Sequence, residues 1–338
     1  MKAIVVREYG GPEKLSYEEE TDPTINESQV LVRIRACSVN RRDVLTRIGQ
    51  GLKIPLPFIP GGDLAGEVVS VGTSVEKFRV GDRVIAYPRL PCGKCKPCLS
   101  KQEDLCAHSS IMLGAYAEMI SLPEVTLLPI PPNMSYDIGA SIPIDFITAW
   151  NLLVTIGKLD IGDTVLVYAG GSGLGTSAIS ICKQRGAEVI TTVGEEWKID
   201  RAQAAGADHV INRKNEKIAE SIMKITSGRG VDLVLDHVGA PTWQESLHSL
   251  REGGKMLVCG TTGGNQASID IRQFYSKKLS IHGGLLGPRE DLVTVVKLFE
   301  EGKLSSVIDS LFKLEDAAQA HSKMEHSEHF GKIILKPR

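Results

Sequence analysis

The fold is decided by the stretch DTVLVYAGGSGLGTSAISICKQRG, residues 163–186. An apolar run leads directly into a glycine-rich loop, and a segment of helical character follows. The spacing of residues 170, 172 and 175 is a G-x-G-x-x-G pattern with serine in the middle position. Such a loop turns sharply, approaches a pyrophosphate closely and aims helix N–H groups at it. The stretch therefore predicts a dinucleotide-binding loop made by Gly170, Gly171, Ser172, Gly173, Leu174 and Gly175.

The surrounding sequence supplies the context that this loop requires. Apolar runs recur at intervals of about 20 to 24 residues, as expected for alternating strands and helices, near Val167, Ile190, Val210, Val234, Leu257 and Ile281. Helical segments separate the earlier runs at 172–186, 195–206, 215–228 and 241–254. The pattern predicts an α/β fold with a doubly wound, six-stranded parallel Rossmann sheet. The alternative, a flexible surface loop without a ligand, does not explain the strand–loop–helix context.

The choice of dinucleotide depends on the end of the second predicted strand. Gly194 and Glu195 lie about 20 residues beyond the loop, where the adenosine ribose is read. Glu195 would accept hydrogen bonds from the ribose hydroxyls of NAD(H). Lys198 and Arg213 would instead hold the 2′-phosphate of NADP(H). The residues by themselves leave both cofactors open, with solvated charges as a third interpretation.

The residues before this predicted sheet show a different sequence pattern. Residues 1–125 contain short β-rich stretches separated by Gly and Pro, at 1–7, 29–36, 64–71, 82–87 and 116–122. Tight turns between short strands predict a small barrel or sandwich. After Arg289 we expect one helix, 290–303, and a closing strand, 331–337.

Four of the seven cysteines lie within fifteen positions, at Cys92, Cys95, Cys98 and Cys106. Four thiolates can close a tetrahedral zinc site and leave no position for water or substrate, so the predicted zinc is structural. Two disulfides, an iron–sulfur cluster and an empty lobe are the alternatives. Cys37, Cys182 and Cys259 stand in apolar contexts and are expected to be packing residues.

Composition excludes several classes of protein. The 338 residues carry 39 basic and 41 acidic side chains, a net charge of −2. This balance argues against a nucleic-acid partner. No apolar run approaches the roughly 20 residues of a membrane span, and the N-terminus lacks the pattern of a secretory signal. We expect a cytoplasmic protein with no membrane partner.

Together these features resemble the medium-chain dehydrogenase/reductase superfamily over essentially the whole chain. The segments that carry the resemblance are 60–72, 78–84, the cysteine lobe, 167–194, 231–239 and 253–260. The resemblance implies a GroES-like catalytic domain at 1–130 and 290–338, containing the zinc lobe, and a Rossmann domain at 131–289. It also implies that Val238 and Gly260 lie near the nicotinamide.

Zinc alcohol dehydrogenases of this superfamily bind a second, catalytic zinc through three motifs. Those motifs fall on residues 40–43, 61–63 and 144–148, where the ligand positions hold Asn40, Gly62 and Ile144. The pattern resembles the zinc-independent quinone and enoyl reductases, which typically use NADPH. The resemblance therefore favours NADP(H) over NAD(H), with one structural zinc ion per chain.

The implied activity is hydride transfer to a quinone or an α,β-unsaturated carbonyl. A few hydrogen-bond donors suffice for such an acceptor, and we expect Asn40 and Thr148 to provide polar groups while Asp43 orients a neighbour. Two alternatives stay open: an alcohol dehydrogenase with an unrecognised metal, and a non-catalytic cofactor-binding protein. The resemblance also implies a homodimer or homotetramer, joined through the strand at 278–286.

Overall fold

The computed structural model describes residues 1–51 and 53–338. The chain divides into two compact units. The first unit comprises Met1–Ile144, Pro288–Glu300 and Ile308–Arg338, and the second comprises Asp145–Gly287 and Glu301–Val307. Each unit has its own hydrophobic core, and each is described separately below.

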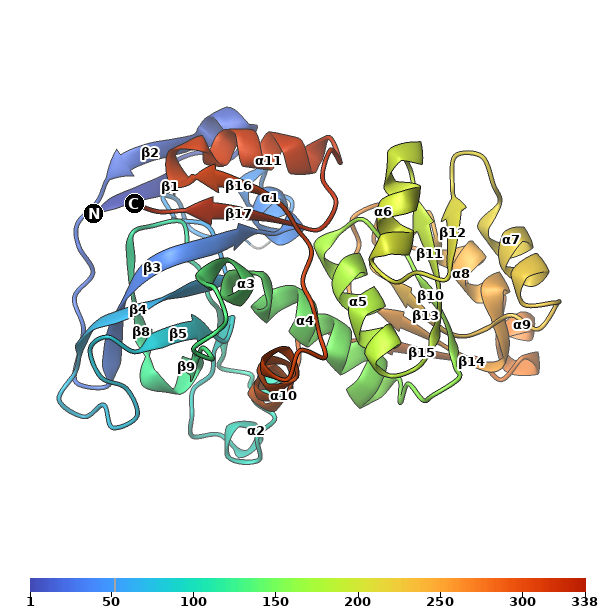
Figure 1. Ribbon diagram of the computed structural model, residues 1–338, viewed down its shortest axis with the longest axis horizontal. Helices are drawn as coiled ribbons and strands as arrows, with labels where there is room; N and C mark the ends of the chain where they lie inside the picture. The colour runs from blue at the N-terminus through green and yellow to red at the C-terminus, as the bar shows by residue number, and fades with distance from the viewer. Residues whose placement is uncertain (52) are drawn as a thin grey trace. The chain divides into compact units, whose positions relative to one another are not determined.

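The second unit is built on a six-stranded parallel sheet (Figure 1). Its strands are β10 (Thr164–Val167), β11 (Glu188–Val193), β12 (His209–Asn212), β13 (Val231–Asp236), β14 (Leu250–Val258) and β15 (Ser280–Gly283). The strand order β12-β11-β10-β13-β14-β15 reverses direction between β10 and β13. Because crossovers between parallel strands are right-handed, this reversal puts helices on both faces and opens a ligand site beside β10. The predicted doubly wound sheet is confirmed.

Helices connect these strands as expected. They are α5 (Gly173–Gln184), α6 (Ile199–Ala204), α7 (Ile218–Ile225), α8 (Trp243–Ser249) and α9 (Ile271–Ser276), with a 3₁₀ turn η5 (Glu196–Lys198) before α6. The prediction of helix through residue 254 is wrong, since β14 already begins at Leu250. Gly253 has a positive φ of 74°, and the register of β14 on β13 shifts there, so the glycine pair forms an irregular strand entrance.

The first unit is a mixed β structure. Its main sheet contains β3 (Gln29–Val39), β4 (Leu64–Val71), β5 (Arg83–Ala86), β8 (Met119–Pro123), β9 (Leu127–Pro129), β16 (Ile308–Lys313) and β17 (Lys332–Lys336). Two small sheets pair β1 (Lys2–Val6) with β2 (Leu15–Glu19), and β6 (Arg89–Leu90) with β7 (Ser110–Ile111). The expected early strands are present, and the sequence pattern did not predict β2, β6, β7, β9 and β16.

The helices of the first unit include several that the sequence pattern did not predict. They are α1 (Arg41–Arg47), α2 (Lys96–Leu99), α3 (Tyr136–Ser141), α10 (Arg289–Glu300) and α11 (Ala317–Glu325), with 3₁₀ turns η1 (Pro12–Lys14), η2 (Glu103–Leu105), η3 (Glu124–Thr126) and η6 (Leu314–Asp316). The first unit extends to Ile144 instead of residue 130, because α3 packs on β3 and β4. Helix α4 (Pro143–Trp150) and the π-helical turn η4 (Asn151–Ile156) follow.

Across the described part of the chain, no helix combines the length and apolar character needed to span a membrane.

Candidate functional site

The glycine-rich loop of the second unit lies between β10 and the start of α5. Ala169 enters the loop with φ +48°, a conformation that non-glycine residues rarely adopt. A Cβ on Gly175 would lie 2.3 Å from the Ala169 carbonyl oxygen, and one on Gly170 would lie 2.3 Å from Thr191 Oγ1. Both glycines are therefore required by close packing of the loop on its neighbours.

The first turn of α5 presents free backbone donors. Ser172 caps the helix, since its Oγ accepts a hydrogen bond from Gly175 N at 2.9 Å. In the described residues, the N–H groups of Gly171, Gly173 and Leu174 donate to no acceptor. Unpaired N–H groups at a helix N-terminus, next to a backbone without side chains, suit a pyrophosphate. The loop residues thus fit the dinucleotide predicted for them.

The residues expected to read the ribose lie together at the carboxyl ends of β11 and β12. The Arg213 guanidinium packs on Gly194, with Nη2 at 2.9 Å from the position of a Cβ there. Lys214 Nζ donates to Glu195 at 2.6 Å, and this hydrogen bond lowers the pKa of the carboxylate. Lys198 is only 8% exposed. The charges of Lys214, Lys198 and Arg213 surround Glu195, so the local charge is positive.

The carboxyl ends of β13 and β14 carry the two remaining predicted cofactor residues. The buried Asp236 carboxylate accepts hydrogen bonds from Val238 N at 2.8 Å and Gly239 N at 3.0 Å, and so fixes the loop after β13. Gly260 lies in an open hollow of about 520 Å³ at the ends of β14 and β15. A Cβ at Gly260 would lie 2.5 Å from the His237 carbonyl oxygen. A glycine is therefore required at this predicted nicotinamide end.

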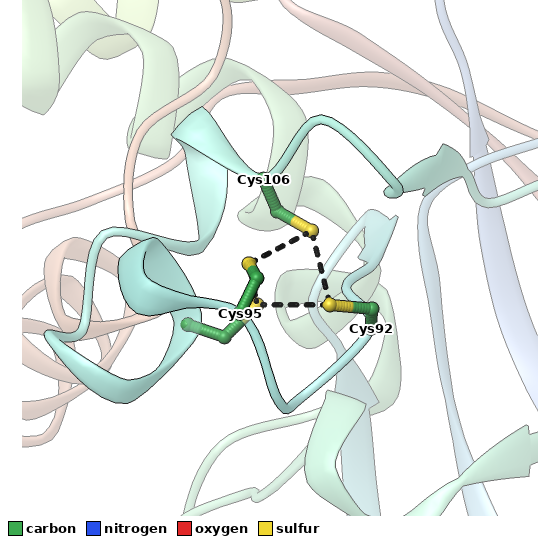
Figure 2. A group of neighbouring side chains, drawn as sticks. Cys92, Cys95 and Cys106 are labelled. Carbon is green, nitrogen blue, oxygen red and sulfur yellow. Dashed lines mark hydrogen bonds between the residues drawn. The ribbon is translucent and has the colours of Figure 1, made fainter.

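The four cysteines of the lobe in the first unit converge, and Figure 2 shows the sulfur atoms of Cys92, Cys95 and Cys106 pointing toward one another. The Sγ–Sγ distances are 3.4 Å for Cys95–Cys98, 3.6 Å for Cys95–Cys106 and Cys92–Cys106, and 3.9 Å for Cys92–Cys98. A tetrahedral zinc with metal–sulfur bonds of ~2.3 Å has edges of roughly 3.8 Å. The four sulfur atoms fit one zinc ion, and they are too far apart for disulfides.

The surroundings of the lobe shift the pKa values of its thiols in opposite directions. Backbone N–H groups of Lys94 and Cys95 lower the pKa of Cys92 to about 6. Desolvation, followed by the neighbouring thiols, raises the pKa of Cys98 to about 12. A bound cation would draw the proton from such a thiol. Lys94, Lys96 and Lys101 lie in the same loop, and Lys101 is exposed.

The three motifs read as vacant ligand positions for a catalytic zinc do meet in space, around the fully buried Asp63. Asp63 Oδ2 accepts hydrogen bonds from Ser38 Oγ at 2.8 Å and Asn40 Nδ2 at 2.9 Å, while Oδ1 accepts from Ile144 N at 2.9 Å. Lys332, 2% exposed, donates to Asn40 Oδ1 at 2.9 Å and to Asp63 at 3.3 Å. We call Ser38, Asn40, Asp63, Ile144 and Lys332 the Asp63 cluster.

The Asp63 cluster does not fit a divalent metal. Position 40 offers an amide that is already bonded, and position 144 offers only a backbone N–H. At position 62 the Arg42 guanidinium fills the space that a histidine side chain would need. The ammonium group of Lys332 already balances the charge of the Asp63 carboxylate. In residues 1–51 and 53–338, the group that can hold a metal is the cysteine lobe.

A second buried network fixes Asp43. Asp43 Oδ2 accepts a hydrogen bond from Asn40 N at 3.0 Å at the start of α1, and Tyr116 Oη lies 3.4 Å away. Tyr116 Oη is 3.1 Å from His321 Nε2, and Arg47 Nη1 is 3.3 Å from His321 Nδ1. Arginine can only donate, so His321 accepts at Nδ1 and donates at Nε2. Burial raises the pKa of Asp43 and lowers that of His321 to about 3.

The predicted catalytic residues fall in both units. Thr148 lies in α4, is 7% exposed and belongs to the second unit, whereas Asn40 and Asp43 belong to the first. A shared role for these three residues stays a prediction.

Several site residues were not predicted. Lys332 and His321 lie near the C-terminus, far in sequence from their partners at positions 40 and 116, and no spacing links them. Lys214 could have been predicted from the sequence, because it directly follows Arg213 at the end of a strand. Arg42 lies in the motif at residues 40–43, in which only Asn40 and Asp43 were predicted to have a role.

Comparisons with known proteins agree with this geometry. The alcohol dehydrogenase GroES-like domain family matches residues 26–132, and the zinc-binding dehydrogenase family matches residues 173–301. The chain is 30% identical to a quinone oxidoreductase of Rattus norvegicus, over 99% of this chain and 97% of that protein. It is also 30% identical to an acryloyl-coenzyme A reductase of Sulfurisphaera tokodaii, over the full length of both.

A solved structure described as an NAD-dependent alcohol dehydrogenase is similar over 99% of both chains, with 37% identity and a TM-score of 0.95.

Proposed function

Because the chain belongs to the medium-chain dehydrogenase/reductase superfamily and is an NAD(P)-dependent oxidoreductase, we propose that it reduces a quinone or an α,β-unsaturated carbonyl compound. The observation that carries this proposal is the Asp63 cluster, which puts Lys332 and hydrogen-bonded polar groups where a catalytic metal would need free ligands. An unactivated alcohol loses a hydride readily only when a Lewis acid stabilises its alkoxide.

A conjugated acceptor makes lighter demands on the protein. The negative charge that follows hydride addition spreads onto an oxygen, so hydrogen-bond donors can stabilise it. The reduced nicotinamide supplies the hydride when it is bound. The protein binds the pyrophosphate through the loop at 170–175 and orients the acceptor. In this proposal Asn40 and Thr148 contribute polar groups to the site, and Asp43 fixes Asn40 through its backbone N–H.

NADP(H) is the proposed cofactor. Lys214 neutralises Glu195, which would repel a 2′-phosphate, and Arg213 and Lys198 add two positive charges beside it. One variant, measured with both cofactors, tests this. Arg213→Ala should weaken NADPH binding about tenfold, the loss of roughly one charge-assisted hydrogen bond, and leave NADH binding unchanged. Equal losses for both cofactors would contradict the assignment.

Zinc at the cysteine lobe is proposed as structural. Cys92, Cys95, Cys98 and Cys106 would occupy all four coordination positions, so the ion would stabilise the loop and take no part in hydride transfer.

Turnover of a substrate panel tests the proposed reaction. Purified protein is mixed with NADPH or NADH and with quinones and enones, and oxidation of the cofactor is followed by absorbance. Metal analysis of the same sample should give about one zinc per chain. A value near two would mean a second metal, and the acceptor class would have to be abandoned.

The likeness to an NAD-dependent alcohol dehydrogenase supports one alternative, alcohol oxidation. The same sample is therefore tested with NAD or NADP and a panel of primary and secondary alcohols. Alcohol oxidation without enone or quinone reduction would select the alternative. Cofactor binding without turnover of any substrate would indicate a non-catalytic protein.

We also propose that the protein is a cytoplasmic homodimer or homotetramer. β15 is the edge strand of the six-stranded sheet and is available for pairing with a second copy. A monomer mass in light scattering would contradict this assembly.

A further inference from the structure

The first unit has an open hollow of about 650 Å³, and all of its lining residues belong to that unit. They come from the loop between β4 and β5, from β5 and β9, from the residues that follow β9, and from the start of α10. The volume is within the range of about 300 to 1,000 Å³ that is usual for small-molecule sites. The hollow shares no lining residue with the dinucleotide loop, the Asp63 cluster or the cysteine lobe.

Much of the wall of this hollow is apolar. The apolar side chains that line it are Phe78, Leu127, Pro129, Ile130 and Pro132. Leu127 and Ile130 are 0% and 6% exposed, and Phe78 packs against the hydrophobic core of the unit. The wall is therefore held in place by the core. A hydrocarbon group that covers such a wall removes apolar surface from water, which favours binding.

The charged residues of the lining are mainly basic. They are Lys77, Arg83 and Arg289, against one acidic residue, Asp82. The Asp82 carboxylate already has a partner, because its Oδ2 accepts a hydrogen bond from Arg79 N at 2.9 Å. The lining thus combines a net positive charge with an apolar wall.

Arg289 has more hydrogen-bond donors than partners. Its Nη2 donates to the Leu127 carbonyl oxygen at 2.8 Å, whereas its Nε is buried and has no acceptor in the described residues. Burial lowers the pKa of Arg289, while the nearby charges of Glu103 and Glu290 raise it. Neither acid makes an ion pair with Arg289 in the part of the chain that the structure describes, and Glu290 pairs with Lys101 at 3.5 Å. The guanidinium is therefore partly withdrawn from water and short of acceptors.

The other two basic residues differ in what they can offer a ligand. Arg83 is committed to the protein, since it donates to the carbonyl oxygens of Pro132, at 2.8 Å, and Met134. Lys77 is exposed, and its ammonium group makes no ion pair within residues 1–51 and 53–338. Its backbone is fixed, because Lys77 N donates to the Glu124 carboxylate. Lys77 thus adds an available positive charge at a defined position.

We propose that this hollow binds a small organic anion with a carboxylate head and a hydrocarbon chain. Arg289 holds the carboxylate through its unpaired donors, and Lys77 adds a second positive charge. The chain lies against Phe78 and Ile130. This inference goes beyond the proposed function, because the site is separate from the cofactor and does not depend on which reaction the protein catalyses.

Saturation-transfer NMR with sodium octanoate tests the site. The protein is first saturated with the reduced nicotinamide dinucleotide that it binds more tightly, so that the dinucleotide loop is occupied. Octanoate should bind with a dissociation constant of about 1 mM or below. Butanoate should bind at least about tenfold more weakly, because each buried CH₂ group adds affinity. Octanol and inorganic phosphate should not displace octanoate, because each has only one of the two required parts.

Three variants assign the binding to this hollow. Arg289→Gln should weaken octanoate binding about tenfold, the loss of one charge-assisted hydrogen bond. Lys77→Gln should weaken it less than about fivefold, because solvent screens an exposed charge. Arg79→Gln is the matched control and should leave the affinity unchanged, since Arg79 is exposed in the same loop and does not line the hollow. If Arg289→Gln fails to fold, Lys77→Glu decides, with an expected weakening of at least about threefold and Arg79→Glu as its control.

Four results would overturn the proposal. The first is that octanoate receives no saturation transfer, or receives it only in the absence of the dinucleotide. The second is an equal loss of affinity in Arg289→Gln and Arg79→Gln. Equal affinities for butanoate and octanoate would mean that the apolar wall does not contact the chain. Displacement by inorganic phosphate would indicate a site for charge alone.

Discussion

The first unit contains two places where this superfamily holds metals, and they differ in every physical respect. The cysteine lobe presents four sulfur atoms at 3.4–3.9 Å, in a short loop near solvent. The Asp63 cluster is deeply buried, and its charge is compensated by Lys332. We propose that a metal ion holds the four sulfur atoms of the lobe together, whereas the Asp63 cluster carries its own cation, Lys332. The comparison teaches that a buried carboxylate can be balanced by a side-chain cation instead of a metal ion.

The largest effect is expected at the internal cation. Lys332→Met leaves the buried Asp63 carboxylate without its ion-pair partner, and such a loss costs about 3 to 5 kcal/mol of unfolding free energy. Lys336→Met is the matched control on the same strand, since its partnership with Asp137 is partly exposed and contributes about 1 kcal/mol or less. Urea denaturation of both variants measures the difference. Equal effects would mean that Lys332 is not compensating a buried charge.

The next effect concerns the lobe. Cys98→Ser removes one of four thiolates and should weaken zinc binding at least about 100-fold, more than the loss of an outer-shell contact. Zinc content after dialysis measures this, with Cys182→Ser as the control, since Cys182 is buried in α5. Retention of zinc in Cys98→Ser would mean that the lobe does not bind the metal with four sulfurs.

A smaller effect is expected from pH at the network beside the Asp63 cluster. The pKa of His321 is lowered to about 3 by burial and by Arg47. Between these two values the histidine is protonated in the unfolded state and neutral in the folded state. The free energy of unfolding therefore falls as the pH drops below the ordinary histidine pKa of ~6.5. Between pH 7 and pH 5 the loss should be roughly 2 kcal/mol.

His321→Gln isolates this contribution. Its amide oxygen can accept from Arg47 and its amide nitrogen can donate to Tyr116, so the hydrogen bonds are kept and the titration is removed. Asp43, with a raised pKa, has the opposite sign, and Arg47 stays charged. The same pH slope in both proteins would show that His321 is not the titrating group.

The smallest effect belongs to an exposed ion pair next to the lobe. Lys101 Nζ and Glu290 Oε2 are 3.5 Å apart, with side chains 74% and 56% exposed. Lys101→Ala should change the unfolding free energy by less than about 0.5 kcal/mol, because solvent screens such pairs. A larger change would place this lysine in the charge balance of the thiolates.

The sequence predicted those parts whose signals are local. The loop at 170–175, the six strands of the second unit and the four cysteines each appear as a short pattern with a physical reason. From the sequence, the Asp63 cluster could be predicted only as positions that lack metal ligands. The cation of the cluster, Lys332, could not be predicted, because it reaches Asn40 through the pairing of β17 with β3, across 292 positions. Hydrogen bonds between residues so far apart produce no repeating pattern in the sequence.

The glycine at position 62 bears on what it would take to build a metal site beside Asp63. A histidine there would require the Arg42 guanidinium to move, because its Nη2 lies 1.7 Å from where the new Cβ must go. Replacing Asn40 by cysteine would take from Lys332 its closest acceptor in the cluster and bring an incoming metal ion next to a like charge. Adding metal ligands to this cluster therefore also means rearranging or replacing its two cations.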